Sequence, residues 1–284
     1  MSVFLNQDQL AKIVWNGNEP IAFQCSGAEE TTSFLLDESN LSAQSMLDIS
    51  GIEQRERNSC FLKLPPVFML EAVAFGGKRS GFDYSYNSIE EFLNVQPDDT
   101  IKQEILECMH LVKDQPILFK LTGAFSALAA LIEPMKLYKA MIKSPNLLHQ
   151  ALEKVNLWLM DYAKNVLQNG AIILSFADPS GLCELLGKHF YIDFVANYQL
   201  ALFRFLDPFL AHAAIHICGK NSVDLQKCGL STSTPLPCTQ KNIGEELLLR
   251  AQDTNFAFSG HGCILEEGNA QKCIWKLTLI KREH

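Results

Sequence analysis

The alternation of apolar and polar residues divides most of the chain into helical and extended segments. One helix is predicted from about Ser144 to Asn169, because apolar residues recur there at steps of three and four. Ser144 can cap this helix, Pro145 suits its first position, and Asn169 with Gly170 can end it in a left-handed turn. The next segment begins with an unbroken apolar run (AIILSFA, 171–177), which is typical of a strand covered on both faces.

Seven apolar segments of this kind predict strands, and helical stretches separate most of them. They are residues 20–25, 60–65, 116–123, 171–177, 213–218, 227–232 and 255–260. Repeated pairs of strand and helix indicate an α/β fold with a parallel sheet and helices outside it. From this pattern alone, the sheet is either an open doubly wound sheet or a closed (β/α) barrel.

The chain has 284 residues, of which 48% are hydrophobic and 20% charged, and it contains no low-complexity linker or obvious internal repeat. We expect a single domain over residues 1–284, since α/β barrels of about 250 residues routinely form one domain. The formal net charge is −8, and lysines and arginines do not cluster. Both features argue against a nucleic-acid or anionic-membrane partner, because such partners need a concentrated positive field.

The first residues, MSVFLNQDQLAKIVW, lack the basic and long apolar regions of a signal peptide, and no segment reaches 18 uninterrupted apolar residues. We therefore expect a cytoplasmic protein without a membrane partner. Its nine cysteines are scattered and odd in number, which in a reducing compartment predicts thiols rather than disulfides. A cysteine with a special role is then expected to be a metal ligand or a nucleophile.

Polar residues and glycines gather directly after the predicted strands. They are Thr122–Gly123, Asp178–Pro179, His216–Cys218, Ser231–Thr234 and Gly260–Cys263. In a barrel these positions would surround one rim, where active sites of that fold are built. In an open sheet only the positions near the switch point would meet.

His216 and Cys218 are two positions apart at the end of a predicted strand, so their side chains point to the same face. Imidazole and thiolate are both zinc donors, although a strand-end histidine beside a buried cysteine is also common without a metal. Cys263, after the glycine-rich turn FSGHG, is the third ligand that we favour. The other candidates are Cys228, Cys238 and His261. Three protein ligands with an open fourth position would bind and deprotonate a substrate thiol, which predicts thiol alkylation.

Asp178 follows an apolar strand and precedes Pro179, so it is either a general acid–base or ligand-binding residue, or part of an ordinary turn. Lys120 and Thr122 are two apart on a predicted strand and can face a substrate together, unless Lys120 only extends toward solvent. The sequence contains no P-loop, G-x-G-x-x-G or G-x-S-x-G motif, which argues against nucleotide-dependent and α/β-hydrolase chemistry.

Several segments together resemble the uroporphyrinogen decarboxylase superfamily, and within it the methylcobalamin:coenzyme M methyltransferase branch. They are QDQLAKIVWNGNEPIAF (7–23), FMLEAVAFGG (68–77), PILFKLTGAFSALAALI (116–132), LLHQALEKVNLWLMDYAKNVLQNGAIILSFADPSG (147–181), HICGK (216–220) and FSGHGC (258–263). The resemblance implies a (β/α)8 TIM-type barrel. One βα unit would be shortened or missing, because the stretch between Cys218 and Cys263 is shorter than in the family.

The resemblance also implies one zinc ion held by His216, Cys218 and Cys263, with Asp178 at the cavity. Members of that branch move a methyl group from a methylated corrinoid to the zinc-bound thiol of a small molecule such as coenzyme M. The donor is methylcobalamin or, more usually, a methyl-corrinoid on a small corrinoid protein.

Other functions stay open at this point. A lyase of the decarboxylase type would need no zinc, but the arginine-rich N-terminal motif of that branch is not found here. A non-catalytic corrinoid-binding relative is another alternative. A folate methyl donor is a third, because cobalamin-independent methionine synthases also use a barrel with a His-x-Cys pair and a distant cysteine.

Overall fold

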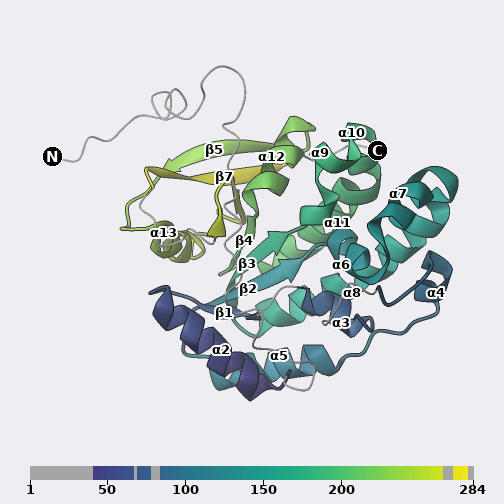
Figure 1. The fold of residues 1–284 in the computed structure, drawn as a ribbon. Coiled ribbons are helices and arrows are strands. Elements are labelled where there is room, and N and C mark those ends of the chain that lie inside the picture. The colour runs from purple at the N-terminus through teal and green to yellow at the C-terminus, as the bar shows by residue number, and fades with distance from the viewer. Residues whose placement is uncertain (1–40, 67–68, 78–83, 265–270, 281–284) are drawn as a thin grey trace.

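A sheet whose strands are mostly parallel runs through the centre of the chain (Figure 1). The structure is a computed structural model and describes residues 41–66, 69–77, 84–264 and 271–280. Seven strands of this described part form the sheet, in the order β1-β2-β3-β4-β6-β7-β5. Their bounds are β1 Leu62–Leu64, β2 Ile117–Thr122, β3 Ala171–Ala177, β4 Ala214–Ile217, β5 Ser231–Pro237, β6 Phe258–Gly260 and β7 Cys273–Leu279.

Five of these strands, β1, β2, β3, β4 and β6, pair with their neighbours in parallel. β7 is antiparallel to both β6 and β5. The predicted α/β class with a mostly parallel sheet is therefore confirmed. β1 and β5 stand at the two ends of the strand order, so closure of the sheet into a barrel stays a prediction.

Helices separate most of the strands, as the sequence pattern predicts. The α-helices are α2 Ala43–Glu56, α3 Leu70–Ala74, α4 Ile89–Leu93, α5 Thr100–Leu111, α6 Ala124–Leu131, α7 Pro134–Lys143, α8 Pro145–Gln168, α9 Cys183–Leu186, α10 Lys188–Tyr191, α11 Asn197–Leu206, α12 Gly219–Lys227 and α13 Ile243–Arg250. Two 3-10 turns, η2 Pro179–Gly181 and η4 Asp207–Phe209, and the π-helical segment η3 Ile192–Ala196 complete the described elements.

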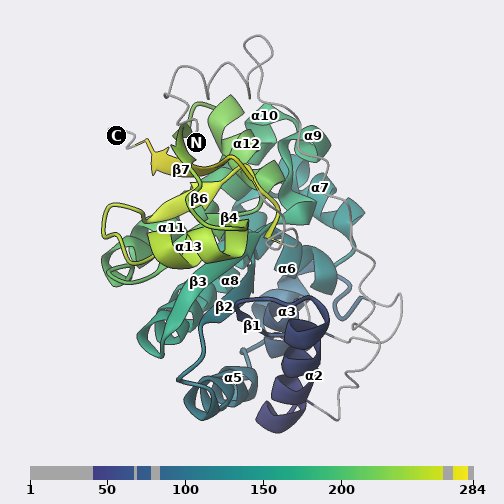
Figure 2. The same ribbon diagram turned by 90° about the vertical axis from the view of Figure 1, so that its left-hand side faces the viewer.

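Helices cover both faces of the sheet (Figures 1 and 2). On one face α8 packs against β3 and against the neighbouring helices α6 and α11. Its buried residues, which follow three- and four-residue steps, include Leu148, Leu152, Val155 and Leu159. Burial of this apolar stripe, rather than helix propensity, supplies most of the stabilisation of such a helix.

On the other face, α13 covers the strands near their amino ends. Ile243 and Leu247 of α13, together with its C-cap Ala251, share one buried cluster with strand residues. The strand residues in that cluster are Leu118 of β2, Ile173 of β3 and Ala214 of β4. Because side chains alternate between the faces of a strand, the next residues on this same face lie two positions further along each strand.

Most of the predicted elements agree with the structure. The helix predicted at 144–169 is α8, and Gly170 after it has a positive φ of 101°. Ser144 does occupy the N-cap position, but its side chain makes no capping hydrogen bond, so that part of the prediction is wrong. Five predicted strands correspond to β1, β2, β3, β4 and β6. The strand predicted at 20–25 lies outside the described residues.

The strand predicted at 227–232 is wrong in its first half. Helix α12 extends to Lys227, and the chain then turns through Gly229, whose φ is +74°. β5 begins only at Ser231, so the polar residues 231–234 lie within a strand rather than after one. β7 is not among the predicted strands, and it follows β6, the last strand that the sequence predicts. In the described part of the chain, no helix combines the length and apolar character needed to span a membrane.

Candidate functional site

A row of buried polar residues crosses the sheet on the face that α13 partly covers. The register pairs Lys120 with Ser175, Ser175 with His216, and His216 with Ser259. All four residues are at most 9% exposed. This row lies two positions beyond the apolar residues that contact α13, toward the carboxyl ends of the parallel strands. A polar row inside an otherwise apolar sheet is a candidate site, because buried polar groups need partners.

His216 is the centre of this row. Its side chain is 3% exposed, and its Nδ1 lies 3.1 Å from Ser259 Oγ. Its Nε2 is buried and has no hydrogen-bond partner among the described residues. Burial lowers the pKa of His216 to about 4, although the nearby backbone of Gly262 opposes this change, so the ring is neutral at neutral pH. In the tautomer in which Nδ1 donates to the serine hydroxyl, Nε2 carries the lone pair that a ligand could use.

The predicted thiol ligands lie on two segments that touch. Cys218 is the half-buried N-cap of α12, and its N–H donates to Phe176 O at 2.8 Å. A Cβ on Gly219 would lie 3.1 Å from Gly262 O, and a Cβ on Gly262 would lie 3.9 Å from His216 Cε1. The segment that leads to Cys263 therefore packs against both His216 and the start of α12. Cys263 itself is 7% exposed.

The fit of these residues to zinc is partial. The imidazole and thiol donors are those that zinc uses, and the unpartnered Nε2 of His216 suits a ligand. However, the described residues contain no group of three or more His, Cys, Asp or Glu side chains arranged to hold a metal. The fold thus brings the segments of His216, Cys218 and Cys263 together without assembling a metal sphere, and the zinc site stays a prediction.

The other cysteines and histidine considered as ligands point elsewhere. Cys228 is the C-cap of α12, at the far end of that helix from Cys218. Cys238 follows β5 and packs at the edge of the cluster around α13. The ring of His261 is directed to α12, with Nε2 2.7 Å from Gln226 Oε1.

Asp178, the predicted catalytic residue, is 1% exposed and accepts hydrogen bonds at both carboxylate oxygens. Oδ1 accepts from Ser126 N at 2.8 Å and Ser126 Oγ at 2.6 Å, and Oδ2 accepts from Gln199 Nε2 at 3.3 Å. Burial raises the pKa of Asp178, while these hydrogen bonds oppose the rise. A Cβ on Gly123 would lie 2.3 Å from Asp178 Oδ2, so only glycine fits there.

The backbone of Asp178 is anchored as well. Its N–H donates to Asn221 Oδ1 at 2.9 Å, and Asn221 Nδ2 donates to Asp178 O at 3.2 Å. The side chain caps the amino end of α6, while Asn221 belongs to α12. Asp178 therefore joins two helices to the end of β3. This arrangement suits a positioning role, and its catalytic assignment stays a prediction. Sequence reasoning did not find Ser126, Gln199 or Asn221.

Lys120 and Thr122, the predicted substrate residues, both contact segments near the start of the described chain. Lys120 Nζ lies 3.6 Å from Glu53 Oε2 and donates to Pro66 O at 3.3 Å. Thr122 N donates to Glu71 Oε1 at 2.8 Å. Burial raises the pKa of Glu71 to about 7. Glu53 and Glu71 were not predicted, because nothing in the local pattern distinguishes them from surface carboxylates.

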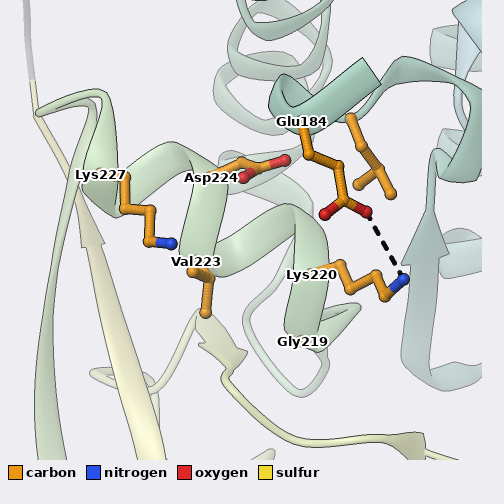
Figure 3. Close-up of a pocket in the computed structure, with 7 residues that line it drawn as sticks. Glu184, Gly219, Lys220, Val223, Asp224 and Lys227 are labelled. Atoms are coloured by element: carbon orange, nitrogen blue, oxygen red, sulfur yellow. Dashed lines mark ion pairs between the residues drawn. The ribbon is translucent and has the colours of Figure 1, made fainter. Parts of the chain in front are cut away.

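A surface groove lies beside the candidate site, between α9 and α12 (Figure 3). It has a volume of about 450 Å³, including space open to solvent, and its lining includes Gly219, the residue after Cys218. Its lining carries charges of both signs, and Lys220 Nζ lies 3.7 Å from Glu184 Oε1 across it. Lys227 and Asp224 contribute the other charges.

The family model for uroporphyrinogen decarboxylase (URO-D) matches residues 72–234, which is more than half of the chain. The chain belongs to the URO-D family. The matched region includes Asp178, His216 and Cys218, whereas Cys263 lies beyond it. The family match thus includes the strand end with the His-x-Cys pair but not the third predicted ligand, Cys263.

Two curated relatives are methyltransferases from Methanosarcina species. The methylcobamide:CoM methyltransferase MtaA of Methanosarcina barkeri is 28% identical over 133 residues, 44% of this chain and 38% of the relative. MtbA of Methanosarcina acetivorans, with the same description, is 26% identical over 110 residues, 39% of this chain and 32% of the relative. The matches therefore span about a third of these relatives' lengths.

A solved structure of a methyltransferase from Methanosarcina mazei is similar in fold. Its TM-score is 0.50 at 19% sequence identity, and the similarity covers 68% of this chain and 62% of the other. At this identity the likeness concerns the fold alone, and it agrees with the mostly parallel α/β sheet of this URO-D family member.

Proposed function

We propose that this chain is a methyltransferase that moves a methyl group from a methylated corrinoid to the thiol of a small acceptor, such as coenzyme M. The URO-D family membership and the partial matches to two methylcobamide:CoM methyltransferases support the proposal. The donor would be methylcobalamin or a methyl-corrinoid on a small corrinoid protein. In the transfer the acceptor sulfur bonds to the methyl carbon, the carbon–cobalt bond breaks, and its electron pair stays on cobalt.

One structural observation carries the proposal. The strand end with His216 and Cys218 lies against the segment with Cys263, and the buried Nε2 of His216 has no hydrogen-bond partner among the described residues. We propose that these three residues hold zinc, with the thiols moving toward the imidazole when the ion binds. A zinc ion held there would lower the pKa of the acceptor's thiol and keep it as the nucleophilic thiolate.

The other residues of the site would bind and orient. Ser259 fixes the ring of His216, since its hydroxyl lies 3.1 Å from Nδ1. Lys120 and Thr122 share the sheet face of His216 and would contact the acceptor. Asp178 would position α6 and α12 at the strand ends without touching the reacting atoms, because both of its oxygens already accept hydrogen bonds.

The test follows the visible spectrum of methylcobalamin during incubation with the zinc-loaded protein and a panel of thiols that includes coenzyme M. The wild type is expected to demethylate the donor with at least one thiol. Cys218→Ala is expected to act at least about tenfold more slowly, the usual scale for damage to a metal site. Cys183→Ala is the matched control, because Cys183 is also half-buried but lies on α9.

Three outcomes would refute the proposal. The first is that no thiol is methylated, and the second is that Cys218→Ala is as fast as the wild type. The third is a protein that folds without zinc and decarboxylates a tetrapyrrole, which would identify the lyase alternative. Corrinoid binding without any turnover would instead identify a non-catalytic relative.

A further inference from the structure

The buried hydroxyl of Ser222 connects the segments of Cys218 and Cys263. Ser222 Oγ donates to Gly219 O at 2.9 Å, within the first turn of α12. The same oxygen accepts from His261 N at 2.8 Å, although the two residues are 39 positions apart. Ser222 is 0% exposed. Its hydroxyl therefore joins the helix that begins after Cys218 to the turn that leads to Cys263.

The turn at His261 has an unusual backbone. Its φ is +57°, in the left-handed region, where a residue with a side chain costs about 1–2 kcal/mol relative to glycine. The neighbouring positions are glycines, so the chain could have placed glycine here without that cost. Residues in a strained conformation are kept where contacts with the surrounding structure hold them in place, and they are common at functional sites.

The side chain of His261 supplies the contacts that hold this conformation. Its Nε2 lies 2.7 Å from Gln226 Oε1, which also accepts from Ser233 Oγ at 2.8 Å. Because the amide oxygen is an acceptor, Nε2 carries the proton, and burial lowers the pKa of His261 to about 4. The ring also lies perpendicular to the ring of Trp275, at a centroid distance of 5.5 Å. His261 thereby contacts α12 and β7, while Gln226 links α12 to Ser233 of β5.

The two segments are packed too closely for side chains between them. A Cβ on Gly260 would lie 2.6 Å from Ser222 Cβ, and a Cβ on Gly219 would lie 3.1 Å from Gly262 O. Small movements of the turn would therefore change the separation of the two cysteine-bearing segments directly, since no flexible side chain lies between them.

We propose that Ser222 and His261 form a latch that positions the Cys263 segment against the Cys218 segment. Both are positioning residues for the zinc site, so the functional meaning of the latch depends on the proposed function. The latch itself is a property of the fold without metal. It predicts that loss of either side chain loosens the Cys263 segment selectively, leaving the rest of the molecule intact.

The first measurement is the alkylation rate of individual cysteines by iodoacetamide in the metal-free protein, read by peptide mass spectrometry. In Ser222→Ala, Cys263 is expected to react at least about tenfold faster than in the wild type, because its segment opens more often. In His261→Gly, which accepts the left-handed backbone but loses the bond to Gln226, a smaller increase of about threefold is expected. Should Ser222→Ala fail to fold, His261→Gly decides the question.

Two controls separate the latch from general loss of stability. Ser231→Ala removes another buried hydroxyl, 2% exposed and without a hydrogen-bond partner among the described residues, so its Cys263 rate should equal the wild-type rate. Cys108 is 0% exposed and donates to Ala43 O at 3.2 Å, and its rate reports opening of the core. The latch is overturned if Cys263 reacts at the wild-type rate in both variants, or if Cys108 accelerates as much as Cys263.

A second measurement tests the positioning role itself. Cobalt(II) is titrated into the protein, and the thiolate-to-cobalt absorption reports binding through cysteine. Ser222→Ala is expected to bind cobalt about tenfold more weakly than both the wild type and Ser231→Ala. Equal affinities would overturn the positioning role. Failure of the wild type to bind cobalt would count against the zinc site of the proposed function, while the alkylation rates would still decide whether the latch exists.

Discussion

The imidazole of His216 and the hydroxyl of Ser259 are register partners on neighbouring parallel strands, and His216 Nδ1 lies 3.1 Å from Ser259 Oγ. This contact orients the ring through Nδ1, while Nε2 is buried and has no hydrogen-bond partner among the described residues. Histidine ligands of metals are usually held in this way by a second group on the opposite ring nitrogen. Ser259 thus gives His216 a defined orientation before any metal binds.

Ser259→Ala is expected to weaken zinc binding about tenfold, because the ring of His216 loses the group that orients it. Competition with a chromophoric chelator measures the affinity. Ser175→Ala is the matched control, since Ser175 pairs with His216 on the opposite side in the same register. Equal affinities of the two variants would show that Ser259 does not orient the ligand.

Glu71 predicts a pH dependence of stability. Its pKa is raised from 4.5 to about 7 in the folded protein, chiefly by burial, so the folded state holds this proton more tightly than the unfolded state. The contribution of Glu71 is therefore fully present below about pH 4.5. It is lost as the pH rises to about 7, with a total on the order of 3 kcal/mol.

Glu71→Gln should remove this dependence, because glutamine stays neutral. The free energy of unfolding in urea, measured at several pH values, should favour the variant over the wild type increasingly between pH 5 and pH 8. Glu90→Gln, at an exposed position of α4, should show no such trend. A difference between Glu71→Gln and wild type that does not vary with pH would contradict the prediction.

Asp178→Ala is expected to lower the free energy of unfolding by about 3 kcal/mol, because Ser126 and Gln199 lose a buried charged acceptor. Asp178→Asn keeps one carbonyl acceptor and should lose less. Urea denaturation monitored by tryptophan fluorescence gives both values. If Asp178→Ala were as stable as the wild type, Asp178 would not be an anchor, and a role in binding or catalysis would gain weight.

The sequence predicts the elements whose signal is local. In α8 apolar residues recur at steps of three and four, and in β2 and β3 they form unbroken runs. These patterns result from burial against neighbouring layers, and each can be recognised within its own segment. β7 was missed because its place between β6 and β5 depends on pairing with distant strands. At 227–230 the sequence does contain a helix-end signal, because Gly229, with its positive φ, follows the end of α12. The strand prediction did not take this glycine into account.

In the candidate site, too, local features are predictable and contacts between distant segments are not. The alternation of side chains along a strand predicts that His216 and Cys218 share a face. The contact of His216 with Ser259 depends on the register of two strands more than forty residues apart. The partners of Asp178 come from three further elements, and no periodicity within one segment could have identified them.

Lys154 provides a prediction about stability far from the site. From α8 its ammonium donates to Leu93 O at 2.8 Å and also to Phe92 O and Val95 O, so it satisfies carbonyls at the end of α4. Lys154→Met keeps the apolar stem but removes the charge, and it is expected to lower the free energy of unfolding by about 1–2 kcal/mol.

Lys164→Met, also on α8, is the control, since the ammonium of Lys164 lies over the Phe209 ring at 5.6 Å. Its loss should be about 0.5 kcal/mol. Equal losses in thermal denaturation would mean that the carbonyls of α4 are solvated equally well without Lys154.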